Sequence, residues 1–275
     1  MIIIYQNIYT LYFSATNRTE IVTNKITETL EQKLKIPAIF LDFTLPKKRE
    51  LEYIFTKEDI VIVGTPVYAG RVPNVLLKFL NGITGGGALV IPVVTFGNRD
   101  YDDALIELRD ILIKDGFEPI TAGAFVGEHS FSNELGKDRP NEEDLSLAKL
   151  LAEKTAEKVF SNSIPDSILK VKGVEFPYRG YFKPLDNEGN FISILKVKPE
   201  TNKDCIDCKI CVYSCPMGSI SLDNVSEVKG MCIKCCACIK KCPQKAKYFD
   251  DPGYLAHLRD LEKIYRKLAE SEIFY

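Results

Sequence analysis

Eight cysteines near the C-terminal end of the chain form two runs with identical spacing. Each run follows the pattern Cys-x-x-Cys-x-x-Cys-x-x-x-Cys-Pro, and each position recurs after 27 residues (232 − 205 = 27). The runs consist of Cys205, Cys208, Cys211 and Cys215, followed by Cys232, Cys235, Cys238 and Cys242. No cysteine lies in residues 1–204. Thiols gathered in this way are typical of a metal or cluster site and not of a disulfide framework.

The spacing favours iron–sulfur cubanes over zinc. Structural zinc is usually held by paired cysteines from the two ends of a finger, whereas three thiolates in one tight loop and a remote fourth suit the corners of a [4Fe–4S] cluster. Zinc remains the alternative. Pro216 and Pro243 end the two loops by fixing φ and removing a backbone donor. Cys236, the ninth cysteine, is expected to be a small buried side chain beside a cluster.

The cysteine runs resemble those of bacterial two-cluster ferredoxins, in which the fourth cysteine of each run binds the other cluster. The resemblance implies a small α+β ferredoxin domain over residues 199–249. It also implies one cluster on Cys205, Cys208, Cys211 and Cys242, and another on Cys232, Cys235, Cys238 and Cys215.

Residues 1–162 are expected to form an α/β domain. Short β-branched runs alternate with longer amphipathic stretches, which is typical of a doubly wound parallel sheet. The sequence predicts five strands, over 8–13, 38–43, 59–64, 88–95 and 120–126. The stretches between them have helical spacing, and a further helix is expected from about Pro140.

Three loops of this domain carry candidate ligand-binding residues. Ligands of open α/β sheets bind at the carboxyl ends of the strands, which directs attention to residues 14–19, 64–73 and 96–103. The first loop offers hydroxyl groups and backbone donors at a helix N-terminus, as a phosphate monoester requires. Ser and Thr also cap helices without any ligand. Each of the other two loops has glycine, an aromatic ring and polar groups.

Together these loops resemble the flavodoxin superfamily, and the whole chain is similar to a bacterial and archaeal family that fuses a flavodoxin-like domain to a two-cluster ferredoxin. The matching stretches also include residues 127–130 and Arg139-Pro140. The resemblance implies the strand order 2-1-3-4-5 and FMN as a cofactor, with the flavin ring between Tyr68 and Tyr101 and its edge bonded by Asn98. The phosphate would lie on Ser14, Thr16, Asn17, Arg18 and Thr19, and the other implied contacts are Pro66, Val67, Ala69, Gly70, Phe96, Gly97 and Asp103.

The first loop departs from the family pattern at two positions. Asn17 stands where glycine is expected, and Arg18 stands where asparagine is expected. Asn tolerates positive φ better than most residues, so the turn can survive. Arg18 can pair with a phosphate or turn to solvent. A ferredoxin on a flavin-free scaffold therefore stays open as an alternative.

Composition and charge exclude several functions. The 275 residues carry 36 basic and 38 acidic side chains, so the net charge of −2 does not favour binding to nucleic acid. No uncharged apolar stretch approaches the length of about 18 residues needed to span a membrane. The opening Met-Ile-Ile-Ile-Tyr lacks the basic segment and cleavage site of a signal peptide, so we expect a cytoplasmic protein.

Two further segments complete the expected organisation. Residues 163–198 contain several prolines and aromatic residues and are expected to form an ordered connector packed between the two domains. Residues 250–275 are expected to form an amphipathic helix, with Leu255, Leu258, Leu261, Tyr265 and Leu268 on one face.

The function expected from these features is electron transfer between FMN and two [4Fe–4S] clusters, which joins two-electron to one-electron chemistry. The partners would be redox proteins that act as donor and acceptor, because no Gly-x-Gly-x-x-Gly fingerprint of a nicotinamide site is present. The alternative is an FMN-dependent reductase of a small molecule, with the ferredoxin half as its electron inlet. No nucleophile triad or two-carboxylate hydrolase site is recognisable, and His129 is a weak candidate at the ligand edge.

Overall fold

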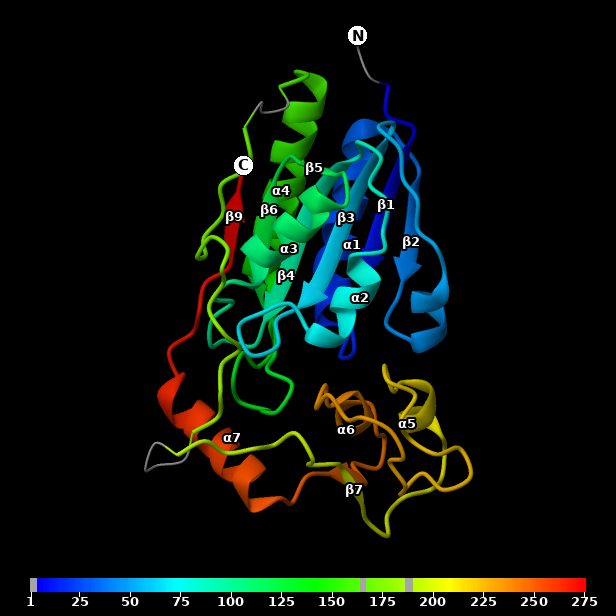
Figure 1. The fold of residues 1–275 in the computed structure, drawn as a ribbon, viewed down its shortest axis with the longest axis vertical. Coiled ribbons are helices and arrows are strands. Elements are labelled where there is room, and N and C mark those ends of the chain that lie inside the picture. The colour runs from blue at the N-terminus through cyan, green and yellow to red at the C-terminus, as the bar shows by residue number, and fades with distance from the viewer. Residues whose placement is uncertain (1–3, 164–166, 186–189) are drawn as a thin grey trace.

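The computed structural model describes residues 4–163, 167–185 and 190–275. Residues 1–3 of the opening apolar run, and residues 164–166 and 186–189 of the expected connector, lie outside the described residues. Figure 1 shows an α/β domain whose parallel strands point toward a smaller unit with little regular structure. We call residues 199–249 the cysteine-rich unit, because all nine cysteines lie in it.

The α/β domain is built on a sheet in the order β2-β1-β3-β4-β6-β9, with β5 paired to β4 beside this path. Every pair is parallel except β6 with β9. The order of the long parallel strands confirms the flavodoxin-like α/β fold. The strands are β1 (Asn7–Tyr12), β2 (Ala38–Asp42), β3 (Asp59–Pro66), β4 (Leu89–Phe96), β5 (Glu118–Pro119), β6 (Ala122–Val126) and β9 (Glu272–Phe274).

The prediction of five strands was wrong, because the sheet has seven. The last parallel strand is divided in two. β5 pairs with the start of β4 at Leu89 and Val90, whereas β6 pairs with Val93 to Phe96. The seventh strand, β9, comes from the extreme C-terminal segment and lies antiparallel on the edge of the sheet.

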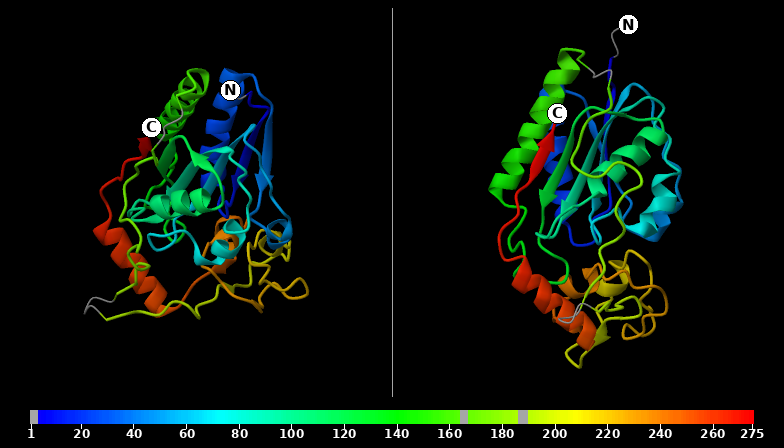
Figure 2. Two further views of the ribbon diagram at one scale, coloured as in Figure 1. Left: turned by 45° about the horizontal axis from the view of Figure 1, so that its top comes forward. Right: turned by 60° about the vertical axis from the view of Figure 1, so that its left-hand side comes forward.

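Helices cover both faces of the sheet. Helices α1 and α4 lie on one face, and α2 and α3 lie on the other (Figure 2). Successive residues of β3 alternate between the two faces, so that Ile60 and Ile62 pack toward α1 and α4 while Val61 and Val63 pack toward α3. Burial on both faces explains why this strand is continuously apolar. The helices are α1 (Arg18–Leu34), α2 (Leu77–Leu80), α3 (Ala104–Lys114) and α4 (Glu142–Phe160), with 3₁₀ helices at Pro46–Glu50 and Asn74–Leu76.

The cysteine-rich unit contains two short helices and one small antiparallel ribbon. The ribbon pairs β7 (Glu200–Thr201) with β8 (Lys247–Tyr248). Helices α5 (Ile210–Tyr213) and α6 (Ala237–Lys240) lie at equivalent places in the two cysteine runs. Each follows a residue with positive φ, 62° at Lys209 and 58° at Cys236, so the two runs share a backbone conformation as well as a spacing.

The C-terminal segment differs from the helix expected over residues 250–275. Helix α7 (Pro252–Ile264) begins after Asp251, whose side chain accepts a hydrogen bond from the N–H of Tyr254 at 2.8 Å. The helix ends at Ile264 and the chain then returns to the sheet as β9, so Leu268 lies outside the helix and is exposed. Within the described residues, no helix is both long and apolar enough to cross a membrane.

Candidate functional site

Two cavities in the cysteine-rich unit are each lined by four cysteines that come from both runs. The first cavity is lined by Cys205, Cys208, Cys211 and Cys242. The second is lined by Cys215, Cys232, Cys235 and Cys238, with Cys236 beside them. The fourth cysteine of each run thus lines the cavity of the other run. In the described part of the chain, no three His, Cys, Asp or Glu side chains form a group that could hold a metal ion.

The two groups of cysteines, which we call the first and second quartets after their cavities, differ in exposure. Cys208 of the first quartet is exposed, whereas Cys235 of the second is buried. Burial raises the thiol pKa of Cys235 and Cys238 far above the ordinary value, since a thiolate is poorly solvated there. Deprotonated sulfur in the second cavity therefore requires nearby positive charge, from a metal or from the protein.

Cys236, which is also buried, is not equivalent to the eight. Its Sγ lies 3.7 Å from the hydroxyl of Tyr254 and 3.5 Å from the carbonyl oxygen of Lys234. Burial raises the pKa of Cys236 to about 12, so the side chain is a neutral thiol at physiological pH.

The loop after β1 leaves a row of backbone donors free. Among the described residues, the N–H groups of residues 15–19 have no hydrogen-bond acceptor. Ser14 and Thr19 close the two ends of the row. The Ser14 side chain accepts from the N–H of Glu20 at 3.1 Å, and the Thr19 hydroxyl lies 2.6 Å from that of Thr95. This row of donors at the start of α1 suits an anion.

The two departures from the family pattern occupy distinct positions in this loop. Asn17 lies just before α1 with a φ of 67°, in the left-handed region that asparagine tolerates and most residues avoid. The side chain of Arg18 forms an ion pair with Glu128, with 2.8 Å between Nη2 and Oε2. Thr16, which precedes Asn17, is half-buried.

The loop after β3 carries Tyr68 to the boundary with the cysteine-rich unit. Tyr68 and Arg71 bond to each other through their backbones, and the turn between them has positive φ at Ala69 (52°) and Gly70 (79°). Tyr68 packs on the same hydrophobic cluster as Cys235. Burial raises the pKa of the Tyr68 hydroxyl, and the thiols of Cys235, Cys236 and Cys232 raise it further. Of the two tyrosines expected to stack on the flavin, Tyr68 is thus the one that lies close to a cysteine cavity.

Pro66 and Val67 lead into this turn. Pro66 is the last residue of β3, and the N–H of Val67 donates to the carbonyl oxygen of Thr95 at 2.8 Å. This bond fixes the start of the loop against the end of β4.

The loop after β4, where Asn98 and Tyr101 are expected to contact the flavin, is bonded to the C-terminal segment. The side-chain amide of Asn98 donates to the carbonyl oxygens of Tyr265 (2.7 Å) and Lys267 (3.1 Å) and accepts from the N–H of Ala269 (3.0 Å). The side-chain NH2 group and the side-chain oxygen of Asn98 therefore both bind the segment before β9.

Tyr101 is fully buried, and its hydroxyl donates to Glu272 of β9 at 2.8 Å. Its ring lies 5.3 Å from that of Phe96, the last residue of β4. Gly97 follows Phe96 and packs against His129 so closely that a Cβ there would lie 2.5 Å from the imidazole Cδ2. Tyr101, one of the aromatic residues expected at the flavin, is thus buried in the core of the α/β domain.

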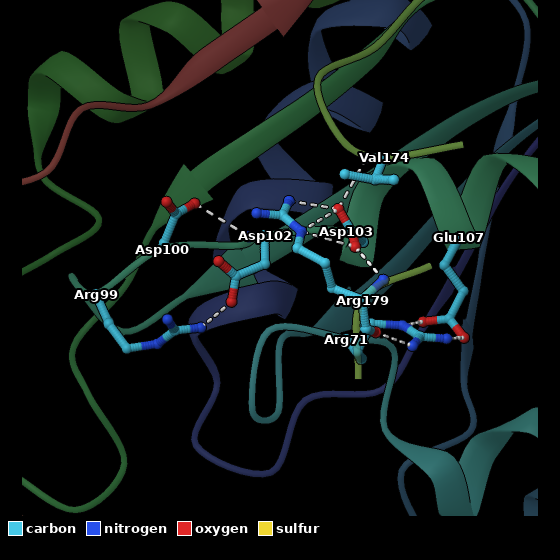
Figure 3. A network of polar contacts seen from close by, with 8 residues as sticks. All are labelled: Arg71, Arg99, Asp100, Asp102, Asp103, Glu107, Val174 and Arg179. Atoms are coloured by element: carbon cyan, nitrogen blue, oxygen red, sulfur yellow. Dashed lines mark hydrogen bonds and ion pairs between the residues drawn. The ribbon is translucent and has the colours of Figure 1, made fainter. Parts of the chain in front are cut away.

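Asp103 belongs to a polar network that fastens the connector to the α/β domain (Figure 3). Its carboxylate accepts from the side chain of Arg179 and from the N–H groups of Val174 (2.9 Å) and Arg179 (2.8 Å). Burial opposes ionisation of this carboxyl, but these donors outweigh it and lower the pKa of Asp103 to about 2. Asp103 therefore anchors the connector to the start of α3.

Arg71 extends this network to α3. Its guanidinium binds both carboxylate oxygens of Glu107 (Figure 3). The two nitrogen–oxygen distances are 2.8 Å and 2.6 Å. The same group lies 4.8 Å from the ring centre of Tyr178 and 5.2 Å from that of Tyr181, both in the connector. Planar stacking and bidentate pairing together make this a rigid attachment of the loop that carries Tyr68.

Sequence reasoning missed the residues that join the two units. Glu128 accepts from Arg18 and also from Lys240 of α6, 2.6 Å away, while Arg49 donates to the carbonyl oxygen of Pro216. Glu128 lies within the stretch 127–130 that resembles the family, but no local pattern distinguishes its role. Such contacts depend on how the units pack.

His129 lies beside Gly97, with its Nδ1 accepting from the N–H of Phe131 at 3.1 Å. Burial, together with the charges of His257, Lys240 and Arg99, lowers the pKa of His129 to about 4. His129 is thus a neutral imidazole at physiological pH.

Comparisons with known proteins give similarity only among solved structures. No protein-family model matches the chain, and no curated protein matches it. The chain is similar to a flavodoxin from the domain Archaea, with 16% identity over 56% of this chain and 99% of that chain and a TM-score of 0.41. It is also similar to a flavodoxin of Streptococcus pneumoniae TIGR4, with 20% identity over 55% of this chain and 99% of that chain and a TM-score of 0.40. A third similar structure is rubredoxin oxygen:oxidoreductase from Desulfovibrio gigas, with 15% identity over 60% of this chain and 38% of that chain and a TM-score of 0.43.

Proposed function

We propose that this chain is an electron-transfer protein that joins FMN, bound at the carboxyl end of the sheet, to two [4Fe–4S] clusters in the cysteine-rich unit. The observation that carries the proposal is the grouping of the eight cysteines into two quartets, the second of which packs beside Tyr68 at that end of the sheet.

The cysteine cavities fit cubanes better than zinc. Each cavity is lined by four cysteines. A tetrahedral zinc site would require its ligands to converge on one point, whereas a cubane takes one sulfur at each iron corner. Backbone N–H groups also reach sulfur, from Ser219 to Cys215 (3.4 Å) and from Ala246 to Cys242 (3.3 Å).

The loop after β1 fits the phosphate of FMN. Five consecutive N–H groups, of residues 15–19, have no acceptor among the described residues and lie at the positive end of α1. Asn17 supplies the positive φ that the turn requires. When bound, FMN supplies one- and two-electron chemistry, and the chain's part is to hold the phosphate and to orient Tyr68 toward the second quartet.

Anaerobic reconstitution of the full chain with iron, sulfide and FMN tests this proposal. We expect about eight iron atoms and one FMN per chain, together with the electron paramagnetic resonance (EPR) signal of reduced [4Fe–4S] clusters. Zinc in place of iron, or a chain that binds clusters but no FMN, contradicts it. Rapid turnover of quinones or nitroaromatic compounds by the reduced protein would identify the small-molecule reductase instead.

Paired cysteine variants test the crossed ligation directly. In a crossed arrangement, Cys215→Ser with Cys235→Ser damages only the second cluster, whereas Cys215→Ser with Cys208→Ser damages both. One intact [4Fe–4S] cluster should therefore remain in the first double variant and none in the second. An uncrossed arrangement gives the reverse result, so the second double variant is a matched control for the first.

A further inference from the structure

Two lysines are buried beside the cysteine cavities without a carboxylate partner. Lys234 is 7% exposed, and its Nζ donates to the carbonyl oxygens of Leu195 (2.5 Å) and Cys232 (2.9 Å). Lys247 is 3% exposed, and its Nζ donates to the hydroxyl of Thr201 at 2.6 Å and to the carbonyl oxygen of Val225. Among the described residues, neither forms an ion pair. Because a buried ammonium without a counter-charge is unfavourable, we expect an anion next to each.

The 27-residue repeat gives an internal comparison of the two sites. The position before the second cysteine of each run is Asp207 in the first and Lys234 in the second (234 − 207 = 27). Their φ angles are 55° and 56°, so the backbones match while the charges are opposite. The side chain of Asp207 is 61% exposed and is paired with Lys209 at 2.8 Å, so it presents little net charge to its cavity.

The second buried lysine does not distinguish the two sites. Lys247 lines the first cavity, and its charge acts on Cys211 of the first quartet and on Cys238 of the second. Hydrogen bonds from the backbone to sulfur are also matched, at 3.3 Å in the first quartet and 3.4 Å in the second. At the matched position before the second cysteine of each run, the fixed charges that differ are therefore those of Asp207 and Lys234.

We propose that Lys234 is the built-in counter-charge of the second cluster and that it sets the midpoint potential of this cluster above that of the first. The inference rests on the proposed function, in which each quartet holds a [4Fe–4S] cluster. One-electron reduction adds one negative charge to a cluster while the donor, a low-potential one-electron reductant, loses one electron, and no atom is transferred. A fixed cation close to the cluster stabilises the more negative form.

Burial of the second quartet acts in the opposite direction, because poorly polarisable surroundings disfavour added charge. The same surroundings also screen the ammonium of Lys234 less, and this group bonds to the backbone of the ligand Cys232 itself. We therefore expect the fixed charge to dominate. An electron that enters at the exposed Cys208 would then move inward, toward the quartet beside Tyr68.

A potentiometric titration of the loaded protein, followed by EPR under anaerobic conditions, tests the inference. Wild-type protein should give two one-electron cluster steps. Lys234→Met should lower the upper step and leave the lower step in place, whereas Lys234→Arg, which keeps the charge, should leave the upper step close to its wild-type value. Iron and sulfide content must show two clusters in each variant. Wild-type protein that binds no cluster refutes the proposed function before any variant is compared.

Substitution at the matched position of the first run gives an independent test that does not disturb a buried residue. Asp207→Lys should raise the midpoint potential of the lower step and leave that of the upper step unchanged. Asp207→Asn should raise the potential of the lower step by a smaller amount. The inference is overturned if Lys234→Met shifts the lower step, if Asp207→Lys shifts the upper step, or if neither variant moves either step. Any of these outcomes would contradict the role of Lys234 and would leave the proposed function, with its two clusters, unaffected.

Discussion

Glu128 and Lys240 face each other across the boundary between the α/β domain and the cysteine-rich unit, with 2.6 Å between Oε1 and Nζ. The other oxygen of Glu128 binds Arg18, so one carboxylate connects the start of α1, the loop after β6 and helix α6. Lys240 lies between two cysteines of the second run. This contact therefore links the candidate phosphate loop to the candidate cluster sites.

Loss of the Lys240 ammonium should loosen the attachment of the cysteine-rich unit. Lys240→Met removes the bonds to Glu128, to the carbonyl oxygen of Ser132 and to the side chain of Asn133. We expect the free energy of unfolding to fall by about 1–3 kcal/mol, because a partly buried carboxylate loses a partner. Urea denaturation of the protein with its clusters and FMN bound measures this change in the free energy of unfolding.

The neighbouring Lys241 offers a matched control, since its side chain has no ion pair among the described residues. Lys241→Met should change the free energy of unfolding by about 0.5 kcal/mol or less. Equal effects of the two substitutions would show that the contact with Glu128 does not hold the units together.

The ion pair of Asp103 and Arg179 should make stability depend on pH below about 4. The folded-state pKa of Asp103 is lowered to about 2, so its contribution is complete above the unfolded-state pKa of about 3.9 and is lost as the pH falls toward 2. Asp103→Asn should lower the free energy of unfolding at pH 7 by roughly 1–3 kcal/mol, and by less at pH 3. Denaturation at both pH values measures this, with the exposed Asp250→Asn as control. An effect that does not depend on pH would exclude ionisation as its cause.

The sequence predicted the features that depend on local patterns. The continuously apolar run of Ile60 to Val63 becomes β3, buried on both faces, because a parallel strand between two helical layers requires apolar residues at every position. The order of the long parallel strands followed from the resemblance carried by the three loops.

The features that the sequence did not predict depend on residues far apart in the chain. Asn98 follows a strand at the ligand edge, where a ring contact was expected, but its amide is bonded to residues 265–269. Tyr101 is bonded to Glu272, 171 positions away. The strand β9, which carries Glu272, is only three residues long, which is too short for a periodic pattern to show.

His129 should remain neutral in acidic buffer. Burial and neighbouring charges lower its pKa to about 4, compared with about 6.5 in the unfolded chain. The unfolded state therefore binds the proton more readily, and stability should decrease as the pH falls from about 6.5 toward 4. The chain has only 2 histidines, so an NMR titration of the imidazole signals of wild-type protein and of His257→Asn assigns both. A signal of His129 that titrates near pH 6.5 would contradict the buried position.

The conformation of Asn17 should decide whether the loop after β1 binds FMN. Asn17→Gly keeps access to the φ of 67° and should bind FMN at least as tightly as wild type, whereas Asn17→Val is strained there by about 1–2 kcal/mol. If binding requires this turn, the Val variant should lose roughly tenfold in affinity, measured by quenching of flavin fluorescence. Glu28→Val, at an exposed position of the same helix, controls for the β-branched side chain and should leave FMN affinity unchanged. Unchanged affinity in Asn17→Val, together with reduced stability, would place the phosphate elsewhere, because the strain would then be present without affecting the ligand.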